Sequence, residues 1–172
     1  LALPRLLHLS RSEADIVISL ERPKRGAVVV SKLADYQLFL YGQRDYLARH
    51  APIAQIDDLR AHSFVHYVDD LLFTRELQLL ESVFQPERFA LRSTSIIAQL
   101  EAVRAGAGLA VLPAFMADSD AGLCRVLPGQ ARFTRTFWMS MAVESRQIAR
   151  IYATWNFLRE AVQAMQPRLS PG

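Results

Sequence analysis

The fold is decided by one stretch at positions 103–113, which reads VRAGAGLAVLP. Apolar residues at helical spacing lead from Ile96 to Val103 and predict a helix. Gly106 and Gly108 predict that this helix ends through the left-handed backbone that glycine permits. The apolar residues 109–112, closed by a proline, then predict a buried strand. A helix that leads directly into a buried strand is typical of an α/β sheet.

The same alternation of strands and helices extends in both directions from this stretch. A β-branched run at 14–18 predicts a strand buried on both faces, as in a parallel sheet. The spacing of apolar residues predicts a final helix after Ser145 that ends before Pro167. We expect further strands at 27–30, 37–41, 63–67, 89–92 and 133–143, and helices at 45–50 and 71–84. This order predicts a mainly parallel α/β sheet.

The composition excludes several classes of protein. The chain has 172 residues, is 51% hydrophobic and carries a formal charge of +3, so it can bury a core. Its basic residues are scattered and form no stripe of the kind that binds nucleic acid. The single cysteine, Cys124, excludes an internal disulfide and a zinc site of paired cysteines; we expect it to be a buried structural thiol in a strand. No apolar run is long enough for a membrane helix, so we expect no membrane contact and a cytoplasmic location.

The sequence contains no catalytic or metal-binding motif. It has neither a glycine-rich phosphate loop nor a Gly-x-Ser-x-Gly nucleophile turn, and none of its histidines forms the i, i+4 pair of a helical metal site. Two pairs of carboxylates, 57–58 and 69–70, are expected to be solvated caps, because adjacent residues do not face each other. We therefore expect no catalytic residue, no cofactor and no metal.

Two features indicate ligand binding. Residues 93–95, Ser-Thr-Ser, precede the helix that begins near Ile96, and a helix N-terminus combines unpaired amides with a partial positive charge. The residues that follow strands, at 19–21, 66–69 and 113–115, lie where open α/β sheets bind ligands. These features alone predict an α/β domain that binds a small ligand.

Five segments also resemble, in order and spacing, the effector domain of LysR-type transcriptional regulators. They are the segment that leads into a strand at 11–18 (RSEADIVI), the strand and helix at 33–47, the segment at 58–65, the stretch at 103–113 and the C-terminal amphipathic helix. The resemblance covers residues 11–165, and 103–113 is its most specific piece.

The resemblance implies a type-II periplasmic-binding-protein-like fold, with two Rossmann-like lobes joined by two crossing strands. Lobe I is expected at residues 1–42 plus 137–166, and lobe II at residues 43–136. The crossing strands are expected at 37–41 and within 133–143. The effector is expected in the cleft between the lobes. By position, the effector-binding residues implied by the resemblance are Ser19, Leu20, Glu21, His66, Tyr67, Asp69, Thr94 and Ser95.

Two parts of such a regulator are not found in the sequence. The N-terminal winged helix-turn-helix that binds DNA is absent, and the first strand-helix-strand of lobe I is missing or shortened to residues 1–9. The resemblance therefore implies a sensor for a small, anionic metabolite that self-associates as a dimer or tetramer and contacts DNA only through the absent domain.

Two alternatives share the fold. An enzyme such as a carboxylate dehydratase or lyase needs a general acid or base, for which His66 and Glu21 are the candidates. An extracytoplasmic solute-binding protein is disfavoured because the apolar start of the chain is too short for a signal segment.

Overall fold

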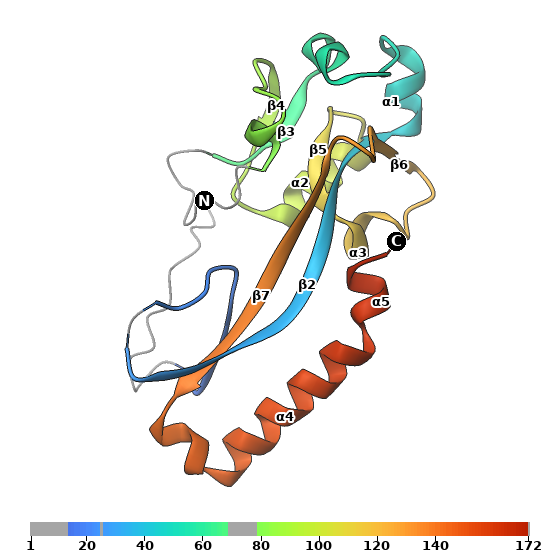
Figure 1. The fold of residues 1–172 in the computed structure, drawn as a ribbon. Helices are drawn as coiled ribbons and strands as arrows, with labels where there is room; N and C mark the ends of the chain where they lie inside the picture. Colours follow the sequence, from blue (N-terminus) through green and yellow to red (C-terminus); the bar gives the residue numbers. More distant parts are fainter. Residues whose placement is uncertain (1–13, 25, 69–78, 172) are drawn as a thin grey trace. The chain divides into compact units, whose positions relative to one another are not determined.

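The structure is a computed structural model that describes residues 14–24, 26–68 and 79–171 (Figure 1). Its strands are β1 (Ile16–Ser19), β2 (Val28–Gln43), β3 (Phe64–His66), β4 (Phe89–Arg92), β5 (Ala110–Pro113), β6 (Leu123–Val126) and β7 (Arg132–Ala142). Its α-helices are α1 (Arg44–Arg49), α2 (Ile96–Arg104), α3 (Ala114–Ala117), α4 (Ala149–Ala164) and α5 (Gln166–Leu169). Short 3₁₀ helices are η1 (Ile56–Ala61), η4 (Leu80–Ser82) and η5 (Glu144–Gln147).

The largest sheet has the order β1-β7-β2-β5, and β6 also pairs with β2. The pairs β1–β7, β2–β5 and β2–β6 are all antiparallel, whereas the pair β3–β4 and the single bridge between Phe64 and Leu109 are parallel. The prediction of a mainly parallel sheet is therefore wrong. Alternating helices and strands do not set the strand direction here, because β5 and β6 both pair with one long strand that enters from an earlier part of the chain.

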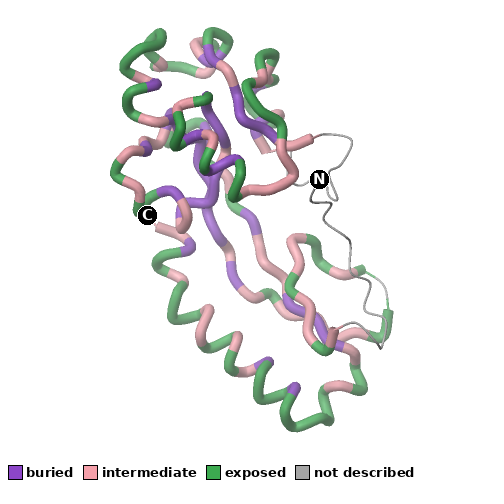
Figure 2. Tube along the Cα trace, turned by 180° about the vertical axis from the view of Figure 1, so that it is seen from behind, coloured by how far each residue is buried: buried purple, intermediate pink, exposed green. Residues whose placement is uncertain are grey.

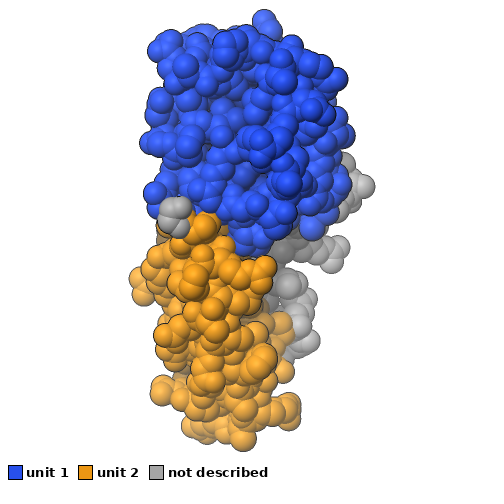
Figure 3. Space-filling model, turned by 90° about the vertical axis from the view of Figure 1, so that its right-hand side faces the viewer, with its two compact units in different colours: residues 1–4, 37–133 blue, residues 5–36, 134–172 orange. Residues whose placement is uncertain are grey.

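The chain divides into two compact units (Figure 3). Among the described residues, unit 1 contains Gln37–Phe133, and unit 2 contains the residues up to Tyr36 and from Thr134 onward. Both divisions fall inside long strands, β2 and β7, so these two strands run through both units. The predicted lobe boundaries at 42/43 and 136/137 lie in or next to the same two strands. That the units are the two lobes stays a prediction.

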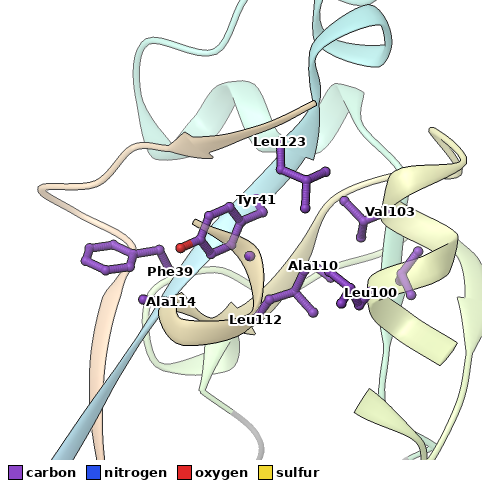
Figure 4. Packing of buried hydrophobic residues seen from close by; sticks show 10 residues of the cluster. Phe39, Tyr41, Leu100, Val103, Ala110, Leu112, Ala114 and Leu123 are labelled. Atoms are coloured by element: carbon purple, nitrogen blue, oxygen red, sulfur yellow. The ribbon is translucent and has the colours of Figure 1, made fainter. Parts of the chain in front are cut away.

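The core of unit 1 lies on both faces of β2. Successive side chains of a strand point to opposite faces, and accordingly Phe39 and Tyr41 belong to one hydrophobic cluster while Leu40 belongs to another. Figure 4 shows the first cluster, in which side chains of α2 lie beside Ala110 and Leu112 of β5. The second cluster gathers residues from α1, η1, β3, η4 and β6.

The core of unit 2 is smaller. Met139 and Met141 of β7 pack with Ile151 and Trp155 of α4, which are the two buried residues of that helix. The rest of α4 is partly or fully exposed (Figure 2). The apolar stripe expected for the final helix is therefore only partly buried among the described residues.

Several local predictions are confirmed. A short helix was expected at 45–50 and lies at Arg44–Arg49, and the extended segment expected at 89–92 is β4. The helix after residues 93–95 begins at Ile96 and is followed by β5, as expected. Cys124 lies in a strand, β6, as expected, but it is only partly buried. Of the helix expected at 71–84, residues 71–78 lie outside the described residues, and the end contains the 3₁₀ turn η4.

Four other local predictions are wrong. The strand at 16–19 is not buried on both faces, because it ends the sheet and leaves Ile18 50% exposed. The strands expected at 27–30 and 37–41 form one continuous strand. Between them, Leu33 packs into the core while Lys32 is exposed, and such alternation of neighbouring side chains is typical of a strand. Of Gly106 and Gly108, which were both expected to have a left-handed backbone, only Gly106 has one (φ 73°). The last helix begins at Ala149, because η5 occupies the residues from 144 to 147.

Candidate functional site

The parallel pair β3–β4 brings two strand ends together in unit 1. His66 at the end of β3 is in register with Arg92 at the end of β4. In a parallel pair both carboxyl ends lie at the same edge of the sheet. Tyr67 and the loop of residues 93–95 therefore start side by side.

Hydrogen bonds fix the loop between β4 and α2. Ser93 N donates to the carbonyl of His66 at 2.9 Å, which ties the loop to the end of β3. The side chain of Gln99 donates to the carbonyl of Ser93 at 2.8 Å, and Gln99 is itself buried. The loop is thus held from both the sheet and the helix.

Residues 93 and 95 also cap α2, as the sequence predicts. Ser95 is the N-cap, and its hydroxyl oxygen accepts from Ala98 N at 3.4 Å. The hydroxyl of Ser93 accepts from Ser95 N at 3.1 Å. The amides of Ile96 and Ile97, in the first turn, have no acceptor within the helix, and they carry the positive end of the helix dipole. This end of α2 is chemically suited to an anionic group.

A small cavity of about 20 Å³ lies behind this edge of unit 1, with room for about one water molecule. Its lining combines apolar residues from four strands and helices with three polar ones: Leu38, Val65, His66, Tyr67, Leu79, Leu80, Gln99 and Val111. The cavity is too small for a metabolite.

His66 forms a sheltered pair with Glu81. Its Nε2 lies 2.7 Å from Oε1 of Glu81, and the two side chains are 10% and 20% exposed. Burial raises the pKa of the Glu81 carboxyl, but hydrogen bonds from His66 and from its own backbone, with the charge of His66, outweigh burial and leave the pKa below its usual range. The other oxygen, Oε2, is buried and has no hydrogen-bond partner among the described residues.

The structure places four of the eight predicted site residues together. His66, Tyr67, Thr94 and Ser95 are all in unit 1 around the edge formed by β3, β4 and α2. Ser19, Leu20 and Glu21 are in unit 2, where the hydroxyl of Ser19 donates to the carbonyl of Glu21 at 2.7 Å. Asp69 lies outside the described residues.

Two residues of this edge were not predicted from the sequence. Gln99 could have been found, because it is a polar residue within the buried stripe of α2. Glu81 could not, since nothing in its local sequence indicates a partner as distant as His66. Among residues 14–24, 26–68 and 79–171, no group of three His, Cys, Asp or Glu side chains could hold a metal ion.

Comparison with known proteins identifies the family. The chain matches the model of the LysR substrate binding domain over residues 3–163. It is similar to the regulatory domain of CrgA, a LysR-type transcriptional regulator from Neisseria meningitidis, with 19% identity over 86% of this chain and 75% of that one, and a TM-score of 0.71. No curated protein matches the chain.

Two further structures are similar at the level of the fold. Full-length AphB from Vibrio cholerae has a TM-score of 0.72 and 17% identity over 90% of this chain and 54% of its own, so the chain spans about half of that protein. The regulatory domain of CcmR from Synechocystis PCC6803, solved in complex with 2-PG, has a TM-score of 0.68 and 20% identity over 90% of this chain and 76% of that one. The mixed α/β fold is type-II periplasmic-binding-protein-like. The chain therefore belongs to the LysR substrate-binding domain family and is an effector-sensing domain of LysR-type transcriptional regulators.

Proposed function

We propose that the chain senses a small anionic metabolite at the edge of unit 1 formed by His66, Tyr67, Thr94 and Ser95. The hydrogen bond from Ser93 N to the carbonyl of His66, at 2.9 Å, is the observation that supports this most directly. It holds the end of β3 against the loop that caps α2, so that groups from both elements reach one ligand. The complex of the similar CcmR regulatory domain with 2-PG supports a ligand-binding role for this fold.

The chemistry of the α2 N-terminus supports an anion. The first-turn amides of Ile96 and Ile97 need an acceptor, and the helix dipole favours negative charge by about 0.3–1 kcal/mol. Ser95 uses its hydroxyl oxygen to accept from Ala98 N. The same hydroxyl has a hydrogen to donate to a carboxylate or phosphate oxygen.

The remaining predicted contacts extend the proposal. We propose that Ser19, Leu20, Glu21 and Asp69 contact the effector as well, as the resemblance to the family implies. A ligand then shifts the protein toward one arrangement only by binding that arrangement more tightly.

Thermal unfolding with a panel of small carboxylates and phosphates tests the proposed site. A ligand present at a hundredfold excess over its Kd should stabilise the protein by about 2.7 kcal/mol. The double variant Thr94→Ala/Ser95→Ala should lose this shift. Ser31→Ala is the matched control, because the Ser31 hydroxyl is exposed and bonds only to the carbonyl of Lys32. A panel that leaves the Tm of the folded protein unchanged would contradict the proposal.

We infer that the sensor acts as part of a regulator that self-associates as a dimer or tetramer in the cytoplasm and contacts DNA through another domain. Family membership supports this arrangement. No helix in the described part of the chain has the length and hydrophobicity needed to cross a membrane. Sedimentation at increasing protein concentration tests self-association, and a constant monomer mass at high concentration would contradict it.

We propose that binding is not followed by catalysis. The family consists of transcription regulators, and Nε2 of His66, a candidate acid or base, is already bonded to Glu81. A ligand found in the thermal panel should be recovered unchanged after prolonged incubation with the protein. Its chemical conversion, lost in a His66→Gln variant, would support the enzyme alternative instead.

A further inference from the structure

A second buried histidine, His62, lies away from the proposed effector site. It follows η1 directly, is 1% exposed, and has both ring nitrogens within hydrogen-bonding distance of a partner. Nε2 lies 3.0 Å from the carbonyl oxygen of Ala51, and Nδ1 lies 3.3 Å from the hydroxyl of Tyr46. Because a carbonyl only accepts, Nε2 carries the proton, and Nδ1 accepts from the tyrosine hydroxyl.

Tyr46 connects this histidine to β3. Its side chain is buried, and its hydroxyl oxygen accepts from Ser63 N at 3.2 Å, directly before β3. Its ring stacks on His50 at a centroid distance of 3.9 Å, and Nδ1 of His50 donates to the carbonyl of Tyr46 at 2.7 Å. The hydrogen bonds of α1, the loop after it and the start of β3 therefore meet at the pair formed by Tyr46 and His62.

This network is complete only while His62 is neutral. A proton on Nδ1 would face a hydroxyl oxygen that already accepts from Ser63 N, and the hydroxyl hydrogen of Tyr46 would lose its acceptor. A charge at a site that is 1% exposed would also be costly. Protonation thus removes the hydrogen bond that the Tyr46 hydroxyl donates to Nδ1 and places a charge at a buried site.

The charged groups near His62 act in opposite directions. Burial lowers the pKa of His62, and the hydrogen bond to Ala51 raises this pKa. The charge of His50, whose ring lies 6.0 Å away, lowers the pKa of His62, and the charge of Asp58 raises it. The carboxylate of Asp58 is itself held by the amides of Ala54 and Gln55 at 2.8 and 3.0 Å. The net result is a pKa below the ordinary value of 6.5.

We propose that His62 is an acid-sensitive latch, which holds residues 44–62 against the start of β3 when neutral and releases them locally when protonated. These residues also form one side of an open hollow of about 450 Å³, through Leu47 and residues 51–53. The other side is formed by residues 125–128. Release of the segment would uncover the apolar residues on both sides.

Hydrogen exchange and NMR on the whole chain test the latch. The ring of His62 should keep the Nε2–H tautomer and titrate below pH 6.5. Amide protection factors in residues 44–63 should fall as the pH drops below 6.5, by at most about tenfold per pH unit for one proton. Protection in residues 38–41 of β2 should change much less over the same range.

The variant His62→Gln provides the matched comparison. Glutamine can donate to the carbonyl of Ala51 and accept from Tyr46 but does not titrate, so protection at pH 7.5 should be kept and its dependence on pH should disappear. In His50→Gln the dependence on pH should remain. The proposal is overturned if His62 of the unmodified protein titrates like an exposed histidine, if β2 loses protection equally, or if His62→Gln keeps the full pH dependence.

Discussion

Gly108 lies where two backbone segments come closest together. A Cβ atom at this position would lie 2.4 Å from the carbonyl oxygen of Ser63, and that oxygen accepts from Leu109 N at 2.9 Å. The bond links the start of β3 to the segment that leads into β5. Glycine is needed here for space and not for a left-handed backbone.

Gly108→Ala should therefore destabilise the protein by about 3 kcal/mol, because neither backbone segment moves without loss of the hydrogen bond between them. Gly129→Ala is the matched control, since a Cβ there meets nothing within 4 Å, and it should change stability by less than about 0.5 kcal/mol. Urea unfolding followed by circular dichroism measures both. Equal stabilities of the two variants would show that the contact with Ser63 is easily relieved.

The pair of His66 and Glu81 should make stability depend on acid pH. The pKa of the Glu81 carboxyl lies below its ordinary value of 4.5, since the hydrogen bond from His66 outweighs burial. A carboxyl whose pKa is lower in the folded state stabilises the protein above about pH 4.5, and this contribution is lost as the pH falls through the folded value.

Glu81→Gln should accordingly reduce stability near pH 7 and have a diminishing effect as the pH falls below 4.5. Unfolding experiments from pH 3 to pH 7 measure the difference from the unmodified protein. Glu87→Gln is the control, because Glu87 is largely exposed and lies 3.8 Å from Arg60, which is also largely exposed. A Glu81→Gln deficit that is constant over this range would argue against a lowered pKa of the Glu81 carboxyl in the folded protein.

At the scale of elements, α2 has both a face that packs in the core and a capped N-terminal end, which is proposed to bind the effector. Leu100 is 6% exposed and packs in the cluster shown in Figure 4, whereas Ile97 is 60% exposed. Leu100→Ala should cost about 2–4 kcal/mol, because it leaves a cavity beside β5. Ile97→Ala should be nearly neutral. Urea unfolding distinguishes the two variants by the urea concentration at the midpoint, provided that the unfolding free energy falls with urea at the same rate in both. Similar losses of stability would mean that Leu100 does not form the core contact of α2.

At the scale of the whole molecule, the continuity of β2 and β7 through both units should couple their unfolding. Both tryptophans, Trp138 and Trp155, belong to unit 2, so their fluorescence follows that unit alone. Leu112 is fully buried in unit 1, and Leu112→Ala should remove about 3 kcal/mol. We expect the fluorescence transition of unit 2 to shift as well.

Comparison of two signals decides this point. Fluorescence and circular dichroism should give one coincident transition in Leu112→Ala, at a lower urea concentration than in the unmodified protein. An unchanged fluorescence midpoint beside a circular dichroism curve in two steps would show that the units unfold independently.

The predictions that succeeded depend on local signals. The serines before α2, the helical spacing of Ile96 to Val103 and the glycine at its end all act within a few residues. The predictions that failed concern properties that depend on distant segments, on which local signals carry no information. The direction of strand pairing and the exposure of Ile18 depend on which distant strands β2 and β1 pair with.

By itself, the sequence determined the family, the type and approximate place of most described elements, and the ligand-suited start of α2, because periodicity, capping and glycine placement act over short distances. Only the tertiary structure decided that the main sheet is antiparallel, that Gly108 is needed for space, and that His66 meets Glu81 while His62 meets Tyr46. These outcomes depend on contacts between segments that are far apart in the chain, and no local pattern specifies such contacts.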